Sequence, residues 1–154
     1  EIGVRLVGSE MCIRDSAWKG QVYAIEKKED ALALLKENRR KFATDNLEIV
    51  PGTAPEAMVE LPVPTHAFIG GSSGNMNEII RLLLDKNPKV RIVINCITLE
   101  TVTEAMNAIR DFSLTDVDIV QLSAARSKSI GRYHMMMGEN PIYIISCSGR
   151  GEEI

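Results

Sequence analysis

Residues 66–83 read HAFIGGSSGNMNEIIRLL, and this stretch decides the fold class. It begins with a short apolar run that is typical of a buried strand, and the run ends in a glycine-rich loop. Apolar side chains then recur at the i, i+3, i+4, i+7 spacing of an amphipathic helix, at Met76, Ile79, Ile80 and Leu83. A strand that passes through a loop into a helix is the repeating unit of an α/β sheet.

The same order of strand and helix recurs on both sides of this stretch. Strands are expected at 21–26, 46–50 and 90–95, and helices at 30–42 and 101–112. This alternation predicts a parallel, doubly wound sheet. The last two apolar runs, 116–126 and 140–147, have no convincing helix between them. We therefore expect these two strands to pair antiparallel and to close the sheet as a hairpin.

Two of the predicted helices carry recognisable signals. Asp30 is a candidate N-cap of the first helix, whose apolar face would hold Leu32, Leu35 and Phe42. In the last helix, Thr101 and Glu104 have the spacing of a capping box.

Composition limits the classes of function. The chain has 154 residues, which suits one domain, and its net charge of −3 gives no electrostatic support to broad nucleic-acid binding. No apolar run approaches the roughly 18–20 residues that a membrane span needs. The three cysteines, Cys12, Cys96 and Cys147, lack metal-ligand spacing. We therefore expect no metal site and a cytoplasmic location.

Ligands of doubly wound sheets bind beyond the carboxyl ends of the strands. Glu26 ends the first strand, where a carboxylate can accept hydrogen bonds from both hydroxyls of an adenosine ribose. It could instead face solvent or pair with Lys27 or Lys28. At the next strand end, the turn from Gly52 to Pro55 could present backbone amides to an adenine edge, or it could only position the following helix.

Two further places could contact a second ligand. The 70–75 loop brings flexible backbone to the centre of the sheet, and Asn95 follows the next strand, where its amide suits a substrate contact or a turn equally. The segment from Arg126 to His134 holds clustered cations, which suit a substrate with several carboxylates, although a solvated charge run is the commoner explanation. His134 could transfer a proton near neutral pH, but a lone histidine is more often structural.

Five stretches of the chain, taken in order, resemble one family: GQVYAIEKKEDALALLKENRRKF, NLEIVPGTAPEAM, HAFIGGSSGN, RIVINCITLETV and RYHMMMGENPIYIIS. They are similar to the decarboxylating precorrin C(15)-methyltransferases of cobalamin biosynthesis, which act on precorrin-6B or its cobalt form. The likeness runs from about Gly20 to Ser146. Its most specific part is the combination of FIGGSSGN, INCITLET and NPIYIIS.

The resemblance implies an α/β, Rossmann-like class I methyltransferase sheet with a C-terminal antiparallel hairpin. It also implies an S-adenosylmethionine-dependent enzyme that methylates carbon 15 of a precorrin-type tetrapyrrole and decarboxylates its carbon 12 acetate arm. The cofactor would contact Glu26, Thr53, Ala54 and Gly70. From the resemblance and the residue patterns above together, we expect the substrate to contact Gly71, Ser72, Asn95, Arg126 and His134. The resemblance further implies a homo-oligomer, expected to be a tetramer, whereas it points to no metal and to no particular catalytic residue.

The chain departs from the family pattern at several places. Thr53 stands where the family commonly has an acidic residue, and Thr65 and His66 lie where Asp is common. The family also carries a first strand and a glycine-rich loop, which cradles the methionine part of the cofactor, about 20 residues before the ribose acid. Residues 1–16, EIGVRLVGSEMCIRDS, hold that place here.

LVGSEMCIRDS can be written back into codons that resemble the transposase adapter used to prepare DNA sequencing libraries, and Gly3 and Val4 would then spell its index. The competing interpretation keeps EIG as the start of the cofactor loop. We expect residues 1–16 to be non-native and residues 17–154 to be a partial methyltransferase domain without its native first strand and glycine loop. Such a chain is expected to be unstable or to bind S-adenosylmethionine poorly, because the strand lies in the middle of the family's sheet.

Three alternatives stay open. The chain could be another class I small-molecule methyltransferase, a nicotinamide-dependent oxidoreductase, or a non-catalytic Rossmann-like binding domain. The expected terminal hairpin argues against the oxidoreductase, because in a simple dinucleotide-binding fold the last strands are also joined by crossover helices. A Gly-x-Gly-x-Gly loop upstream of Ala17 in the native sequence would favour the enzyme over the binding domain.

Overall fold

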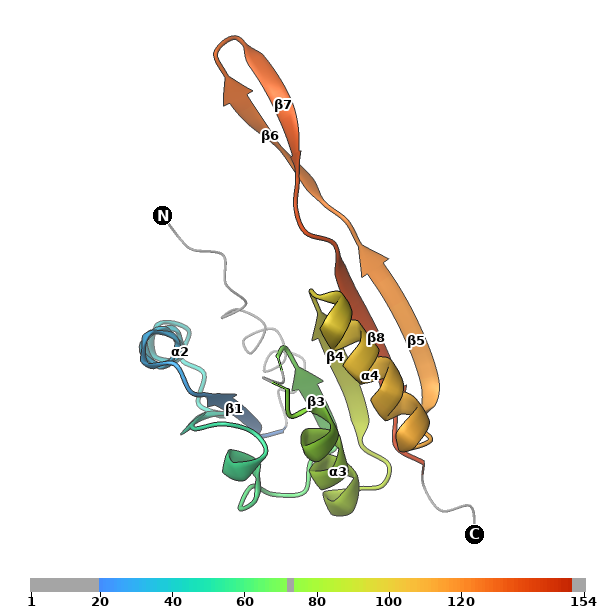
Figure 1. The fold of residues 1–154 in the computed structure, drawn as a ribbon. Coiled ribbons are helices and arrows are strands. Elements are labelled where there is room, and N and C mark those ends of the chain that lie inside the picture. Colours follow the sequence, from blue (N-terminus) through green and yellow to red (C-terminus); the bar gives the residue numbers. More distant parts are fainter. Residues whose placement is uncertain (1–19, 72–73, 151–154) are drawn as a thin grey trace. The chain divides into compact units, whose positions relative to one another are not determined.

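The computed structural model describes residues 20–71 and 74–150 (Figure 1). The predictions for residues 1–16 and for Ser72 lie outside these described residues. Contacts divide the chain into two units, one ending at Pro62 and the other beginning at Val63. No helix in the described ranges is long and apolar enough to cross a membrane.

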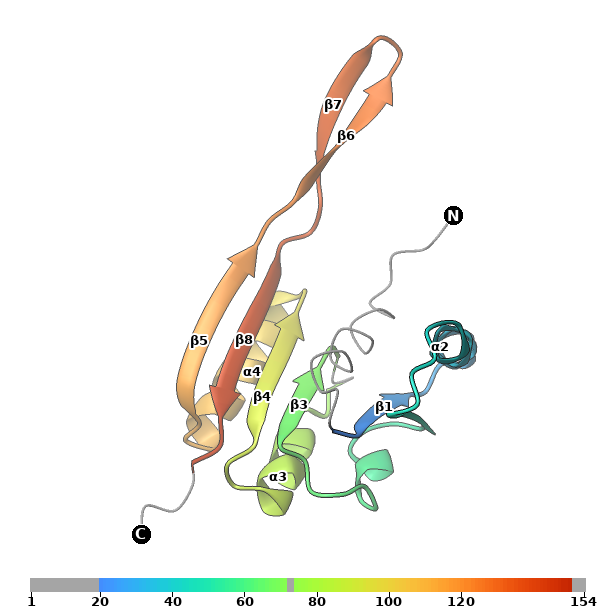
Figure 2. The same ribbon diagram turned by 180° about the vertical axis from the view of Figure 1, so that it is seen from behind.

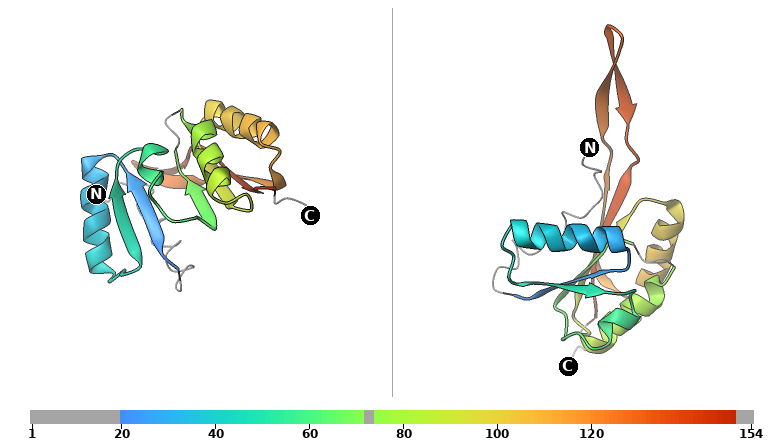
Figure 3. Two further views of the ribbon diagram at one scale, coloured as in Figure 1. Left: turned by 90° about the horizontal axis from the view of Figure 1, so that it is seen from below. Right: turned by 90° about the vertical axis from the view of Figure 1, so that its left-hand side faces the viewer.

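The first unit is a βαβ arrangement. It consists of β1 (Val22–Glu26), α2 (Glu29–Lys41), β2 (Leu47–Pro51) and the short 3-10 helix η1 (Glu56–Met58). β1 and β2 pair in parallel, which confirms the prediction from the alternation of strand and helix. α2 lies along one face of this pair (Figure 3), where Leu35 forms a small core with Ala24 and Leu47. Burial of this apolar face holds the helix in place.

The ends of α2 differ from the expectation. Its N-cap residue is Lys28, so the prediction that Asp30 caps the helix is wrong. Asp30 lies in the first turn, where a negative charge still interacts favourably with the helix dipole. The prediction for Phe42 is also wrong, because this side chain is 55% exposed. α2 ends at Lys41, and Phe42 therefore leaves the helical periodicity that would place it near Leu35.

The second unit is built on a mixed sheet with the strand order β3-β4-β8-β5. Its elements are β3 (His66–Ile69), α3 (Met76–Lys86), β4 (Arg91–Cys96), α4 (Leu99–Asp111), β5 (Thr115–Leu122) and β8 (Ile142–Ser148). β3 and β4 are parallel, whereas β8 is antiparallel to both of its neighbours. This pairing confirms the predicted antiparallel closure of the sheet. α3 and α4 cover the same face of the sheet, as the two opposite views show (Figures 1 and 2).

The core of the second unit lies between this face and the two helices. Ile69, Ile94 and Ile145 are side by side in the register of β3, β4 and β8, and none of them is more than 5% exposed. The apolar face predicted for α3 is confirmed, because all four of its side chains are buried: Met76, Ile79, Ile80 and Leu83.

The start of α4 corrects the predicted capping box. The N-cap is Thr98, whose Oγ1 accepts a hydrogen bond from the N–H of Thr101 at 3.2 Å. Thr101 therefore lies in the first turn of α4 and donates to the N-cap residue. The predicted capping box, in which Thr101 itself would be the N-cap and Glu104 its partner, is wrong. The hydroxyl of Thr98 reaches this otherwise unpaired N–H because the residue itself has an extended backbone.

A second hairpin, which the sequence pattern did not predict, lies between β5 and β8. It consists of β6 (Ala125–Ile130) and β7 (Tyr133–Gly138), and it extends beyond the ends of β5 and β8 (Figure 1). The predicted strand 116–126 covers most of β5, but it also runs into the first residues of β6, which the structure separates from β5. Every residue of β6 and β7 is exposed. A strand without a buried face has no alternation of apolar and polar residues by which to recognise it.

Candidate functional site

Glu26 lies at the carboxyl end of β1, and backbone N–H groups hold its carboxylate. Oε1 accepts hydrogen bonds from the N–H groups of Lys27 and Lys28, each at 2.8 Å. Two donors on one oxygen fix the direction of the side chain. Oε2 accepts no hydrogen bond from the described part of the chain, which leaves it for a ligand. From the sequence, only the side chains of Lys27 and Lys28 were expected as partners of Glu26. Every residue type except proline has a backbone N–H, so the sequence does not show which N–H groups will bind a carboxylate.

The loop after β2 starts directly beside Glu26. The register pairs Glu26 with Pro51, and the N–H of Gly52 donates to the carbonyl oxygen of Glu26 at 3.0 Å. Gly52 has a φ of +149°, and a Cβ there would lie 3.0 Å from the Cβ of Ala57. Glycine is therefore required for both the backbone conformation and the space. The structure thus brings Glu26 and the turn that holds Thr53 and Ala54 to one edge of the β1–β2 pair.

Asn95 and the glycines after β3 form a second group, in the other unit. Ile69 pairs with Ile94, so Gly70 and Asn95 lie at the same level of the parallel pair β3–β4. Gly71 has open space around it, because a Cβ there would meet no atom within 4 Å. Ser72 lies outside the described residues. Asn95 is only 6% exposed, and its Oδ1 is buried without a hydrogen-bond partner in the part of the chain that the structure describes.

The structure does not bring Arg126 and His134 together. In the β6–β7 register, Arg126 pairs with Met137 and His134 pairs with Ser129. Paired residues share a face and successive residues alternate, so Arg126 and His134 lie on opposite faces of the hairpin. The Nε of Arg126 lies 3.7 Å from Oε1 of Glu139, in an exposed ion pair. Arg126 and Lys128 therefore share one face of the hairpin, and His134 lies on the other.

Neither buried cysteine has the properties of a nucleophile. Burial raises the pKa of the Cys96 thiol, and the nearby Glu104 carboxylate raises it further. Burial also raises the pKa of the Cys147 thiol, against a smaller opposing effect of Arg91. Both thiols therefore stay protonated near neutral pH. Within residues 20–71 and 74–150, no cluster of three or more His, Cys, Asp or Glu side chains could hold a metal ion.

Comparison with known families identifies the chain. A family model described as a precorrin methyltransferase domain matches residues 3–148. The chain belongs to this family. Within the precorrin methyltransferase family, a protein of Methanothermobacter thermautotrophicus named "probable cobalt-precorrin-6B C(15)-methyltransferase (decarboxylating)" is 38% identical over 127 residues. The aligned part covers 81% of this chain and 66% of that protein, so the chain spans slightly less than two thirds of this relative.

Two solved structures of precorrin enzymes share the fold. A precorrin-6y C5,15-methyltransferase from Geobacter metallireducens matches with a TM-score of 0.78 and 32% identity, over 88% of this chain and 71% of that one. A precorrin 8W decarboxylase from Methanobacterium thermoautotrophicum matches with a TM-score of 0.73 and 37% identity, over 82% of this chain and 69% of that one. The fold is that of a class I methyltransferase, as the resemblance in sequence implied.

Proposed function

We propose that the protein transfers a methyl group from S-adenosylmethionine to carbon 15 of a precorrin-6B-type tetrapyrrole and decarboxylates the acetate arm on carbon 12. The observation that carries this proposal is the match of the precorrin methyltransferase model to residues 3–148. The names of the similar proteins and structures, which include C(15)-methyltransferases and a decarboxylase, support both halves of the reaction.

The residues at the end of β1 fit the cofactor. Oε2 of Glu26, which accepts no hydrogen bond within the described ranges, suits the vicinal hydroxyls of a ribose. Thr53 and Ala54 follow Gly52 in a turn closed by the hydrogen bond from the N–H of Ala57 to the carbonyl oxygen of Thr53, at 2.9 Å. We assign the adenine to this turn. When bound, S-adenosylmethionine supplies an electrophilic methyl group on its sulfonium sulfur.

The second unit holds the candidate contacts of the tetrapyrrole. Gly70 and Gly71 leave room at the carboxyl end of β3, because neither has a side chain and Gly71 has open space around it. Arg126 and His134 are exposed and would bind carboxylate arms, which Arg holds well through paired N–H groups. Their positions on opposite faces mean that they would bind two different arms or two different molecules. Catalysis needs mainly correct positioning of an electron-rich carbon against the methyl donor.

A direct assay tests the proposed reaction. The 154-residue chain is incubated with methyl-labelled S-adenosylmethionine and enzymatically prepared precorrin-6B, in both its metal-free and its cobalt form. A chain in which the genomic upstream sequence replaces residues 1–16 is tested in parallel. We expect mass spectrometry to show a product that has gained the labelled methyl group and lost carbon dioxide.

The parallel assay separates two questions. Activity in neither chain would reject the proposed reaction, and methylation of an unrelated small molecule instead would favour another class I methyltransferase. Activity only with the genomic upstream sequence would support the adapter interpretation of residues 1–16, whereas equal activity would contradict it. The chain that transfers the methyl group is called the active form below.

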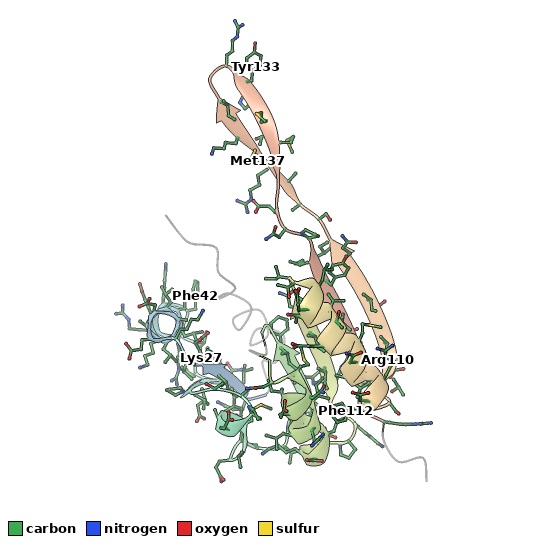
Figure 4. All side chains as sticks on the ribbon, viewed as in Figure 1. Lys27, Phe42, Arg110, Phe112, Tyr133 and Met137 are labelled. Atoms are coloured by element: carbon green, nitrogen blue, oxygen red, sulfur yellow. The ribbon has the colours of Figure 1, made fainter. Side chains whose placement is uncertain are left out.

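We also propose that the protein is a homo-oligomer held through the β6–β7 hairpin. One face of this hairpin carries four exposed apolar side chains, Ile130, Tyr133, Met135 and Met137, beside the cations Arg126 and Lys128. Tyr133 and Met137 are labelled in Figure 4. A two-stranded hairpin alone is only marginally stable in water. The strand β5 adds further exposed apolar side chains, Val117, Ile119, Val120 and Leu122. Exposed apolar side chains gathered on one face of a hairpin suit an interaction site, and a second copy of the chain supplies the same side chains in return.

Light scattering after size-exclusion chromatography tests the oligomer. We expect the double variant Met135→Ser and Met137→Ser to have a lower molar mass than the unmodified chain, because it removes apolar contacts from one face. Met136→Ser is the matched control, because Met136 lies on the other face of β7 and is also exposed. An unmodified chain that is monomeric at every concentration would reject the proposal. A control that dissociates as readily as the double variant would reject the assigned face.

A further inference from the structure

One side-chain atom of Asn95, the amide oxygen Oδ1, is buried without a hydrogen-bond partner among the described residues. Only 6% of the residue is exposed. A buried carbonyl oxygen that has lost its hydrogen bonds to water without replacement destabilises a protein, and native structures contain few such atoms. The presence of an asparagine at this buried position is therefore not explained by a contribution to stability.

The alternation along β4 shows which way Asn95 points. Ile94 and Cys96 on either side of it are completely buried, and Ile94 belongs to the row of isoleucines beneath α3 and α4. Successive side chains of a strand point to opposite faces, so Asn95 points away from these helices. Its neighbours at the same level are Gly70, which directly follows β3, and Ile144 on β8. A glycine and an isoleucine offer no side-chain donor, which explains why Oδ1 has no partner in the sheet.

The location of Asn95 suits a ligand contact. It lies near the carboxyl end of β4, beside the glycines that follow β3, and open α/β sheets bind their ligands at this edge. We propose that Oδ1 of Asn95 accepts a hydrogen bond from an N–H group of a bound ligand. Carboxylate arms cannot supply this hydrogen, because they are acceptors. The inference rests on the proposed function, which offers two N–H donors: the ammonium group of S-adenosylmethionine and a ring nitrogen of the metal-free tetrapyrrole.

The test combines stability with ligand binding. Asn95→Leu removes the amide at similar volume, so we expect the protein without ligands to melt about 2–4 °C higher, because an unsatisfied buried atom is gone. Calorimetry on the active form is then expected to show about a tenfold loss of affinity for either S-adenosylhomocysteine or metal-free precorrin-6B. 5′-Methylthioadenosine lacks the ammonium group, so its unchanged binding together with a loss of affinity for S-adenosylhomocysteine would assign the contact to that group. Asn95→Asp keeps an oxygen in place and is expected to retain the affinity within about threefold.

Asn87 provides the matched control. Its Nδ2 donates to the carbonyl oxygen of Pro64 at 2.8 Å, and its Oδ1 accepts from the N–H of Lys89 at 3.0 Å. Asn87→Leu should therefore lower the melting temperature and leave the affinities for both ligands unchanged.

Three results would overturn the inference. The first is a melting temperature of Asn95→Leu that falls as that of Asn87→Leu does. The second is that Asn95→Leu binds S-adenosylhomocysteine and precorrin-6B within twofold of the unmodified protein. The third is that Asn95→Leu loses affinity equally for these two ligands and for 5′-methylthioadenosine. Failure of the proposed function is recognised separately, because the unmodified protein would then bind and methylate no precorrin. A higher melting temperature together with a loss of affinity for one ligand is the result that only a ligand contact produces.

Discussion

Glu26→Ala is expected to lower the affinity of the active form for S-adenosylmethionine at least about a hundredfold. The variant removes the only carboxylate at the end of β1, and hydrogen bonds to a charged group contribute more to binding than neutral ones. Two such bonds to a ribose account for a loss of this size, because each factor of ten corresponds to about 1.4 kcal/mol. Isothermal titration calorimetry with S-adenosylhomocysteine measures the loss directly.

Two further variants separate the ligand contact from the local fold. Glu26→Gln keeps one oxygen that can accept from the N–H groups of Lys27 and Lys28, but it loses the charge and replaces the second acceptor oxygen by an NH2 donor. We expect it to bind the cofactor better than Glu26→Ala and worse than the unmodified protein. Glu48→Ala removes an exposed carboxylate from the neighbouring strand and should bind normally. Binding by Glu26→Ala within threefold of the unmodified protein would reject the assignment of the ribose to this residue.

Ile94→Ala is expected to lower the free energy of unfolding by about 3 kcal/mol. Ile94 is fully buried between Ile69 and Ile145 in the central row of the four-stranded sheet. Truncation removes apolar contacts with two strands and leaves a cavity beneath the helices, which the close-packed surroundings refill only in part. Urea denaturation followed by circular dichroism measures the change.

Ile119 serves as the control for this prediction. It pairs with Ile145 on the other side of β8, so it belongs to the same row, but it is 46% exposed. Ile119→Ala should therefore cost less than about 1 kcal/mol. An equal loss of unfolding free energy in the two variants would mean that burial does not decide how much an isoleucine of this row stabilises the fold. The core described above would then be wrong.

The parts of the fold that bury an apolar face could be predicted from the sequence. The spacing of Met76, Ile79, Ile80 and Leu83 predicted the buried face of α3 because tertiary packing and periodicity agree there. The β6–β7 hairpin has no buried face and therefore left no pattern to recognise. Phe42 was misplaced because one residue beyond the helix end is enough to break the periodicity.

The candidate site could be predicted in outline only. Strand ends are visible in a sequence, so Glu26, the Gly52 turn and Asn95 were expected at the carboxyl edges of their strands, where the structure has them. The contacts that decide the chemistry of these residues cannot be read from residue types. The N–H groups that orient Glu26 belong to the backbone, and the missing partner of Asn95 follows from neighbours on two other strands.

The position of β8 has a consequence for how the second unit folds. This strand is the last in the described chain, yet it lies between β4 and β5 and supplies every sheet hydrogen bond that joins them. During synthesis β4 and β5 therefore emerge without the strand that joins them, and their unpaired edges stay open until residues 142–148 arrive. Pairing of β4 with β8 spans about 50 residues of sequence, and contacts between such distant segments slow folding. The last described strand to leave the ribosome is thus an inner strand of the sheet, and the sheet is complete only when this strand inserts between β4 and β5.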